Sequence, residues 1–133
     1  MSPQPASDTA AAAGRADGAE ADALSAAALD LSIILPAFNE EAALGDDLDD
    51  IRRAMEGGPW RYEIIVVDDG SRDRTPQIAA ERPWVRLLQH PFNRGNGAAR
   101  TTGVKAALGR VVMFTDADRT YPNDRMPEMM ALI

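Results

Sequence analysis

Acidic residues follow three short apolar runs of this 133-residue chain, and they are the residues best able to do chemistry. The set is Glu40, Asp68, Asp69, Asp116 and Asp118. Carboxylates held close together repel one another, so such a set needs a cation or hydrogen-bond donors. The chain has one histidine and no cysteine. Oxygen ligands therefore remain, and these suit Mg²⁺ or Mn²⁺.

Asp116 and Asp118 are the predicted metal ligands, because residues i and i+2 of an extended segment point to the same side. A hard divalent ion held by one or two carboxylates commonly completes its shell with substrate phosphates. Asp68 or Asp69 could instead accept hydrogen bonds from a nucleobase N–H or a ribose hydroxyl. Each pattern alone is weak, since Asp-Asp-Gly-Ser is also a good turn sequence. Their shared position after predicted strands is what indicates a site.

Four apolar runs alternate with helical patterns and predict an α/β fold with a parallel sheet. Strands are expected at 31–35, 63–67, 84–88 and 111–114, with helices at 40–56, 77–82, 98–108 and from residue 127 onward. The first strand should stop at Pro36, because proline donates no hydrogen bond to a sheet ladder. Strand–helix alternation gives right-handed crossovers, and ligands then bind beyond the carboxyl ends of the strands. The acidic set lies at those ends.

The aromatic residues and the histidine are interpreted as structural. His90 is expected to fill a structural role, and Trp60, Trp84 and Phe92 to lie in the core or beside strands. The spacing of three methionines is typical of a helix core stripe: Met126, Met129 and Met130. A dinucleotide fingerprint around residues 95–97 is disfavoured, because residues 89–94 separate it from the end of the preceding strand.

Composition narrows the classes of partner. The net charge of −7 disfavours nucleic-acid binding. No apolar run reaches the ~18 residues of a membrane helix, so no transmembrane segment is expected and membrane contact would be peripheral. Residues 1–30 are rich in alanine and lack aromatic residues, which predicts a disordered tail before one domain at 31–133.

Four segments together resemble the family-2 glycosyltransferases with the GT-A fold. They are Ile33–Glu41, Glu63–Thr75, Asn93–Gly103 and Val111–Asp118. Within the family, the chain is most similar to the polyprenyl-phosphate branch, such as the dolichyl-phosphate glucose and mannose synthases. The resemblance implies a GT-A, Rossmann-like parallel sheet with flanking helices, truncated after the fourth strand.

The family motifs also imply roles for particular residues. Those implied to bind the nucleotide sugar are Pro36, Phe38, Glu40, Val66, Asp68, Asp69, Asp116 and Ala117. Those implied to bind Mg²⁺ or Mn²⁺ are Asp116 and Asp118. The chain departs from the family at Phe38, where many members have Tyr, and at Asn96, where this branch often has Lys.

The resemblance implies transfer of a sugar from a UDP- or GDP-linked donor to an acceptor, with polyprenyl phosphate at a membrane surface expected. It implies a cytoplasmic location, extending to the cytoplasmic face of the membrane. The acceptor half of the family lies after the D-x-D motif, so catalytic residues are expected beyond Ile133. This chain is then the donor-binding half, without turnover on its own. The alternative is a non-catalytic nucleotide-sugar-binding fragment or remnant.

A phosphoacceptor signalling domain is a third class that also pairs two adjacent aspartates with a later one around Mg²⁺. That class expects the acidic pair after the first strand. Here the pair, Asp68 and Asp69, follows the second predicted strand, so this class is disfavoured.

Overall fold

Four parallel strands form the sheet of this computed structural model, which describes residues 28–116 and 126–131. They are β2 (Leu31–Ala37), β3 (Tyr62–Asp68), β4 (Val85–Gln89) and β5 (Val111–Phe114), in the order β4-β3-β2-β5. Every described pairing is parallel, with Ala37 opposite Asp68 and Asp68 opposite Gln89. The predicted parallel α/β sheet is confirmed, and the carboxyl ends of β2, β3 and β4 meet at one edge.

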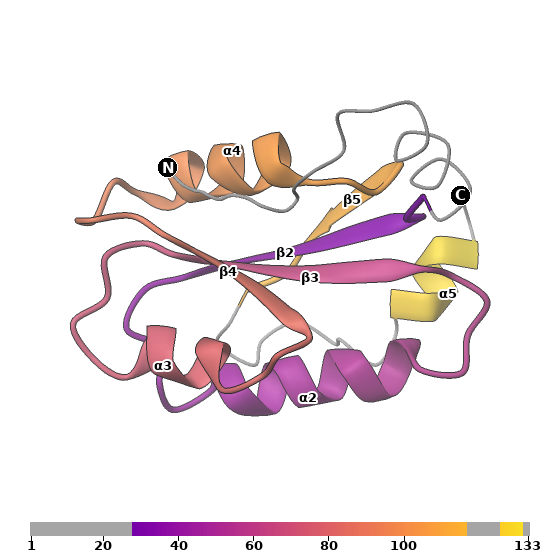
Figure 1. The fold of residues 1–133 in the computed structure, drawn as a ribbon, viewed down its shortest axis with the longest axis horizontal. Helices are drawn as coiled ribbons and strands as arrows, with labels where there is room; N and C mark the ends of the chain where they lie inside the picture. Colours follow the sequence, from indigo (N-terminus) through magenta and orange to yellow (C-terminus); the bar gives the residue numbers. More distant parts are fainter. Residues whose placement is uncertain (1–27, 117–125, 132–133) are drawn as a thin grey trace.

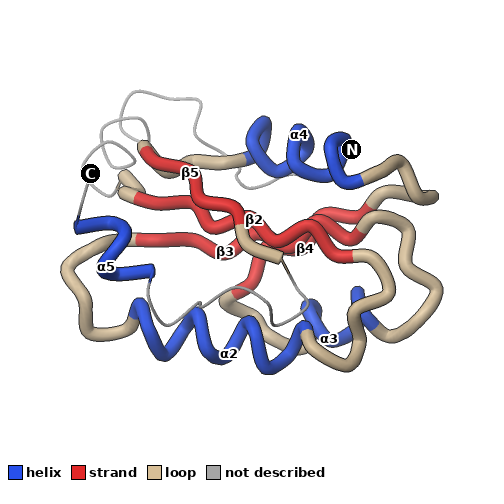
Figure 2. The backbone as a smooth tube through the Cα atoms, turned by 180° about the vertical axis from the view of Figure 1, so that it is seen from behind, coloured by secondary structure: helices blue, strands red, loops and turns tan. Residues whose placement is uncertain are grey.

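Helices cover both faces of this sheet. They are α2 (Leu44–Met55), α3 (Thr75–Ala80), α4 (Asn96–Ala106) and α5 (Met126–Ala131). Figure 1 shows α2 and α3 below the sheet and α4 above it, with α5 on the side of α2. The view from behind in Figure 2 shows the same three layers. The loops at the carboxyl ends of the strands therefore have helices on either side.

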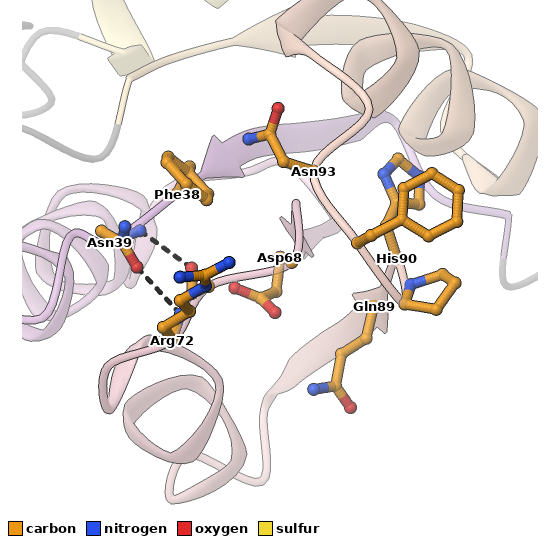
Figure 3. Close-up of a pocket in the computed structure, with 11 residues that line it drawn as sticks. Phe38, Asn39, Asp68, Arg72, Gln89, His90 and Asn93 are labelled. Atoms are coloured by element: carbon orange, nitrogen blue, oxygen red, sulfur yellow. Dashed lines mark hydrogen bonds between the residues drawn. The ribbon is translucent and has the colours of Figure 1, made fainter.

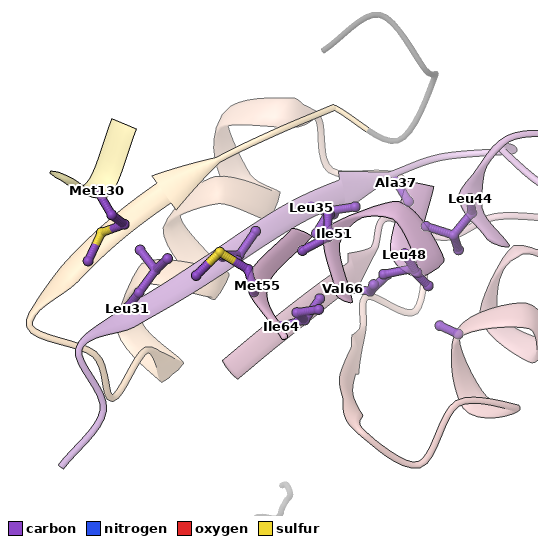
Figure 4. Packing of buried hydrophobic residues seen from close by; sticks show 12 residues of the cluster. Leu31, Leu35, Ala37, Leu44, Leu48, Ile51, Met55, Ile64, Val66 and Met130 are labelled. Atoms are coloured by element: carbon purple, nitrogen blue, oxygen red, sulfur yellow. The ribbon is translucent and has the colours of Figure 1, made fainter. Parts of the chain in front are cut away.

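The larger part of the core lies between the sheet and α2. Leu44, Leu48, Ile51 and Met55 form one buried stripe of α2, as their spacing predicts. They pack against alternate residues of β2 and β3, and Figure 4 shows this interdigitation. Fully burying such a side chain contributes about 1.5–3 kcal/mol. This layer accordingly anchors β2 and β3, the strands that lead into the site.

The smaller part of the core lies between the sheet and α4. Ile34, Ile65 and Val67 face this side and pack with Ala99 of α4. Gly103 of α4 lies so close to the sheet that a Cβ there would be 2.5 Å from Ile34 Cγ2. The small residues of α4 thus bring its backbone close to β2.

Pro36 does not end the first strand as predicted, because β2 continues to Ala37. The Ile34 carbonyl accepts a hydrogen bond from the Thr115 N–H, so positions 34 and 36 direct their backbone polar groups toward β5. The pairing of β2 with β5 ends at Ile34 and Phe114. The missing N–H of Pro36 therefore removes no ladder hydrogen bond.

Helix boundaries also differ from prediction. The segment from Glu40 to Ala43 forms a turn before α2, because the N–H of Glu40 donates to Thr75 Oγ1 and that of Glu41 donates to Asp73 Oδ2. The helix expected at 77–82 begins two residues earlier, because Thr75 is the first residue of α3. Helix α4 lies two residues earlier than expected. The starts of these three helices lie just after the loops that follow β2, β3 and β4.

Trp60 and Trp84 pack against the larger core, as predicted. The prediction for Phe92 is wrong, because its side chain is 64% exposed. Met130 is buried in the larger core, whereas the side chains of Met126 and Met129 lie outside the described residues. Residues 1–27 of the predicted tail also lie outside them. In the described part of the chain, no helix has the length and hydropathy needed to cross a bilayer.

Candidate functional site

A pocket of about 720 Å³ opens at the carboxyl ends of β2, β3 and β4. Its lining comes from three chain segments that follow these strands (Figure 3). The lining residues are Phe38, Asn39, Asp68, Gly70, Ser71, Arg72, Gln89, His90, Pro91, Phe92 and Asn93. A pocket at this edge is what a parallel sheet with helical crossovers favours.

Asp68 is the last residue of β3 and lies at the bottom of this pocket. Its side chain is nearly inaccessible, with the residue 2% exposed. Its Oδ1 atom is buried and has no hydrogen-bond partner among the described residues. A buried carboxylate oxygen without a donor is costly, and most such atoms in native proteins are paired. The oxygen is therefore suited to accept a hydrogen bond from a bound molecule.

Phe38 provides an apolar wall, and Arg72 brings a positive charge. The Phe38 side chain is 45% exposed and points into the pocket in Figure 3. An exposed aromatic ring beside an unpartnered acceptor suits a planar ligand that stacks and donates an N–H. Arg72 is also exposed and lines the same pocket, so the site carries both charges.

The two loops that carry Phe38 and Arg72 are held together by reciprocal hydrogen bonds. The Asn39 N–H donates to Ser71 Oγ at 2.8 Å, and Asn39 Oδ1 accepts from the Arg72 N–H at 2.9 Å (Figure 3). Asn39 has a φ of 53°, a left-handed conformation that asparagine tolerates better than most residues. The loop after β2 and the loop after β3 thus form one wall of the pocket.

Asp69 lies behind the pocket and is bonded to the protein itself. Its Oδ1 accepts hydrogen bonds from His90 Nδ1 at 2.8 Å and from the Arg94 N–H at 2.9 Å. Its Oδ2 accepts from the Gly95 N–H at 2.9 Å. Burial raises the pKa of Asp69, but these hydrogen bonds outweigh burial, so its pKa lies below the usual value.

His90 links this carboxylate to α4, because its Nε2 lies 2.8 Å from Thr102 Oγ1. The residue is 7% exposed, which confirms the predicted structural role. It also lines the pocket, a position that its sequence context did not indicate.

The structure brings only some of the predicted site residues together. Phe38 and Asp68 share the pocket, whereas Pro36 is buried within β2 and Val66 is fully buried in the larger core. Glu40 follows Asn39 in the turn before α2, half-buried and outside the pocket lining.

Of the two predicted metal ligands, the structure describes Asp116 alone. Asp116 is exposed and follows β5, across β2 from the pocket. Ala117 and Asp118 lie outside the described residues. Within residues 28–116 and 126–131, no three Asp, Glu or His side chains converge as a metal site would require.

Sequence reasoning missed several residues of the lining: Asn39, Ser71, Arg72, Gln89 and Asn93. All of them lie at or after strand ends, which was the available signal. Carboxylates are the stronger signal in a sequence, whereas most of the polar side chains in this lining are neutral.

Comparison with known proteins identifies the family. Residues 32–133 match the model described as glycosyl transferase family 2. The chain belongs to glycosyl transferase family 2. The resemblance that the four motifs indicated is thereby confirmed.

Relatives in this family include proteins named for lipid-phosphate acceptors. The chain is 40% identical over 104 residues to the dolichyl-phosphate hexose transferase of Haloferax volcanii, covering 78% of this chain and 43% of that protein. It is 43% identical over 103 residues to the dolichyl-phosphate beta-glucosyltransferase of Drosophila melanogaster, covering 68% of this chain and 31% of that protein. The chain therefore spans less than half the length of these family 2 members.

Solved structures of similar fold include complexes with nucleotides. S. aureus TarS 1–349 in complex with UDP superposes with a TM-score of 0.68 at 29% identity, over 79% of this chain and 32% of that one. The mannosyltransferase PcManGT from Pyrobaculum calidifontis, in complex with GDP-Man and Mn²⁺, gives 0.66 at 28% identity, over 77% and 32%. These neighbours confirm the predicted GT-A fold.

Proposed function

We propose that the pocket binds the nucleotide of a UDP- or GDP-linked sugar, and that the whole protein transfers this sugar to an acceptor. The observation that carries the proposal is the buried, unpartnered Oδ1 of Asp68 beside the exposed ring of Phe38. Uracil and guanine are planar and each offers a ring N–H. Stacking on Phe38 and donation to Asp68 would satisfy both features at once.

The proposed metal ligands are Asp116 and Asp118. Asp116 is an exposed carboxylate at the same sheet edge as the pocket, and a carboxylate fits Mg²⁺ or Mn²⁺. Such an ion would neutralise charge on the diphosphate as it leaves the sugar. The Mn²⁺ in the PcManGT complex with GDP-Man supports this proposal.

The proposed acceptor is a polyprenyl phosphate at the cytoplasmic face of a membrane. Two relatives are named for dolichyl phosphate, which supports a lipid-phosphate acceptor. The net charge of −7 disfavours a nucleic acid as the acceptor. The acceptor site and the catalytic residues are expected beyond Ile133.

Calorimetric titration of the full 133-residue chain with UDP and GDP, with and without Mn²⁺, tests the proposal. Asp68→Ala should weaken nucleotide binding about tenfold or more in both conditions, because a charge-assisted hydrogen bond is lost. The matched control Asp46→Ala removes the same charge from the exposed first turn of α2 and should bind like the unsubstituted chain.

The metal proposal has its own readout in the same titrations. Asp118→Ala should remove the Mn²⁺-dependent part of the affinity and leave the rest. Equal affinity with and without Mn²⁺ would contradict the metal site. Unchanged affinity in Asp68→Ala would contradict the nucleotide site.

A further inference from the structure

We propose that Asp69 is a positioning residue, which holds residues 90–95, the site loop, in the shape that receives the nucleotide. This inference rests on the proposed function and assigns Asp69 a role that differs from direct nucleotide binding. Asp69 does not line the pocket, whereas four residues of the site loop, His90 to Asn93, do. Asp69 would therefore act on the ligand through the loop.

The hydrogen bonds of Asp69 occupy both of its oxygens with donors from the site loop. His90 Nδ1 and the N–H of Arg94 reach Oδ1, and the N–H of Gly95 reaches Oδ2, all at 2.8–2.9 Å. The side chains of Asp69 and His90 are each only 5% exposed. The carboxylate thus fixes both ends of the site loop at once.

These hydrogen bonds also determine which ring nitrogen of His90 carries the proton. Asp69 accepts from two backbone N–H groups, so as a carboxylate it requires the proton on His90 Nδ1. In the neutral ring Nε2 is then an acceptor, and the Thr102 hydroxyl donates to it. The loop is therefore connected through His90 to the second turn of α4.

Close backbone packing restrains the site loop in addition to the hydrogen bonds of Asp69. A Cβ on Gly70 would lie 2.4 Å from the Phe92 carbonyl carbon and 2.5 Å from the Asn93 nitrogen. The His90 N–H donates to the Asp68 carbonyl at 2.8 Å. Gly95 has a φ of 101°, which closes the loop before α4 begins. Loss of the Asp69 contacts would release the end of the loop that no strand holds.

Asp69→Asn is the sharpest test, because an amide has one acceptor oxygen and its NH₂ would face an N–H donor. Asp68→Asn is the matched control, since it makes the same chemical change one residue earlier. Amide hydrogen exchange of the free chain should become at least tenfold faster at Arg94 and Gly95 in Asp69→Asn. Both amides should keep their protection in Asp68→Asn.

Two substitutions of His90 provide a rescue experiment. The amide nitrogen of Asn can replace Nδ1 and keep the bond to Asp69, whereas that of Gln reaches toward Thr102 and loses it. We expect His90→Asn to bind UDP or GDP several-fold more tightly than His90→Gln. A general loss of packing at a buried histidine would weaken both variants alike. Lys105→Gln, exposed in the last turn of α4, serves as the unaffected control.

The outcomes separate this inference from the proposed function. If the unsubstituted chain binds neither nucleotide, the proposed function fails, while hydrogen exchange, which needs no ligand, still decides whether Asp69 holds the loop. If nucleotide binds and Asp69→Asn binds it as tightly, the positioning role is overturned. Unchanged protection of Arg94 and Gly95 in Asp69→Asn would overturn it as well.

Discussion

Asp68 and Asp69 have identical side chains and adjacent positions, yet they meet opposite surroundings. Successive side chains of an extended segment point to opposite sides, so Asp68 lines the pocket and Asp69 contacts the site loop. Asp69 accepts three hydrogen bonds from described residues, and Oδ1 of Asp68 accepts none from them. A carboxylate paired in this way stabilises a fold, whereas a buried oxygen without a donor costs stability until a ligand pairs with it.

This difference leads to a prediction for Asp68→Asn. Removing a buried charge whose Oδ1 lacks a donor should raise the free energy of unfolding by about 1 kcal/mol, because the desolvation cost of the amide is smaller. The same substitution should weaken nucleotide binding, so stability and function change in opposite directions. Urea denaturation of the ligand-free chain measures the first effect. A lower unfolding free energy in Asp68→Asn would show that the carboxylate has a structural role instead.

The sequence indicated the acidic pair, but it did not show which aspartate lines the pocket and which one bonds to the protein. Which aspartate is satisfied depends on the Arg94 and Gly95 N–H groups, about 25 residues later, and hydrophobic periodicity carries no information on such contacts. Phe92 was wrongly expected near the core for the same reason. Its ring lies on a loop whose path follows from the fit of its backbone over Gly70.

At the scale of elements, α4 is unusual because small residues rather than large ones face the sheet. Ala99 and Gly103 are its buried residues, and the helix has a weak apolar stripe. The close approach that Gly103 permits sets the distance of α4 from β2. Its neighbour Thr102 forms the hydrogen bond with His90 Nε2. The packing of α4 is therefore connected to the geometry of the pocket.

Two glycines of α4 provide a matched test of this packing. Gly103→Ala would place a methyl group against Ile34, and we expect it to destabilise the chain by about 1–3 kcal/mol. A Cβ on Gly97 meets open space, so Gly97→Ala should stabilise by about 0.5–1 kcal/mol through helix propensity. Thermal unfolding monitored by circular dichroism measures both. Equal effects of the two substitutions would mean that α4 does not rest closely on β2.

Element positions could be predicted because strong local patterns mark them. The run of residues 111–114 matches β5, and the stripe of α2 matches its buried face. The predicted boundaries were wrong where contacts between residues distant in sequence determine them. The end of β2 depends on which neighbouring strand Pro36 faces, and the start of α2 depends on hydrogen bonds to Asp73 and Thr75.

At the scale of the whole molecule, the strand order determines where the connections between strands change direction. The connections through α2 and α3 lie on one face of the sheet, whereas α4 crosses the other face to reach β5 (Figure 1). The connections therefore diverge between β2 and β5, which is where ligands bind in open α/β sheets. Asp68 lies on one side of this divergence and Asp116 on the other. A nucleotide diphosphate is a ligand that could reach from one to the other.

Three carboxylates make the stability of the whole chain sensitive to acid. The hydrogen bond from Arg82 lowers the pKa of Asp49. Burial raises the pKa values of Asp69 and Asp73, but hydrogen bonds outweigh it and leave both below the usual value. A pKa that is lower in the folded state adds stability above the unfolded value of about 3.9, and this stability is lost as pH falls through the folded values.

Net charge acts in the opposite direction at higher pH. The chain carries −7 at pH 7 and its pI is about 4.6, so protonation between pH 7 and pH 5 relieves self-repulsion. We therefore expect the urea midpoint to hold or rise slightly down to pH 5 and to fall steeply below pH 4. Asp69→Asn should start from a lower midpoint at pH 7 and lose less of it between pH 4 and pH 2, because its contribution is already absent. Asp46→Asn, exposed on α2, should follow the unsubstituted profile. A midpoint that does not fall between pH 4 and pH 2 would show that these hydrogen-bonded carboxylates do not govern acid stability.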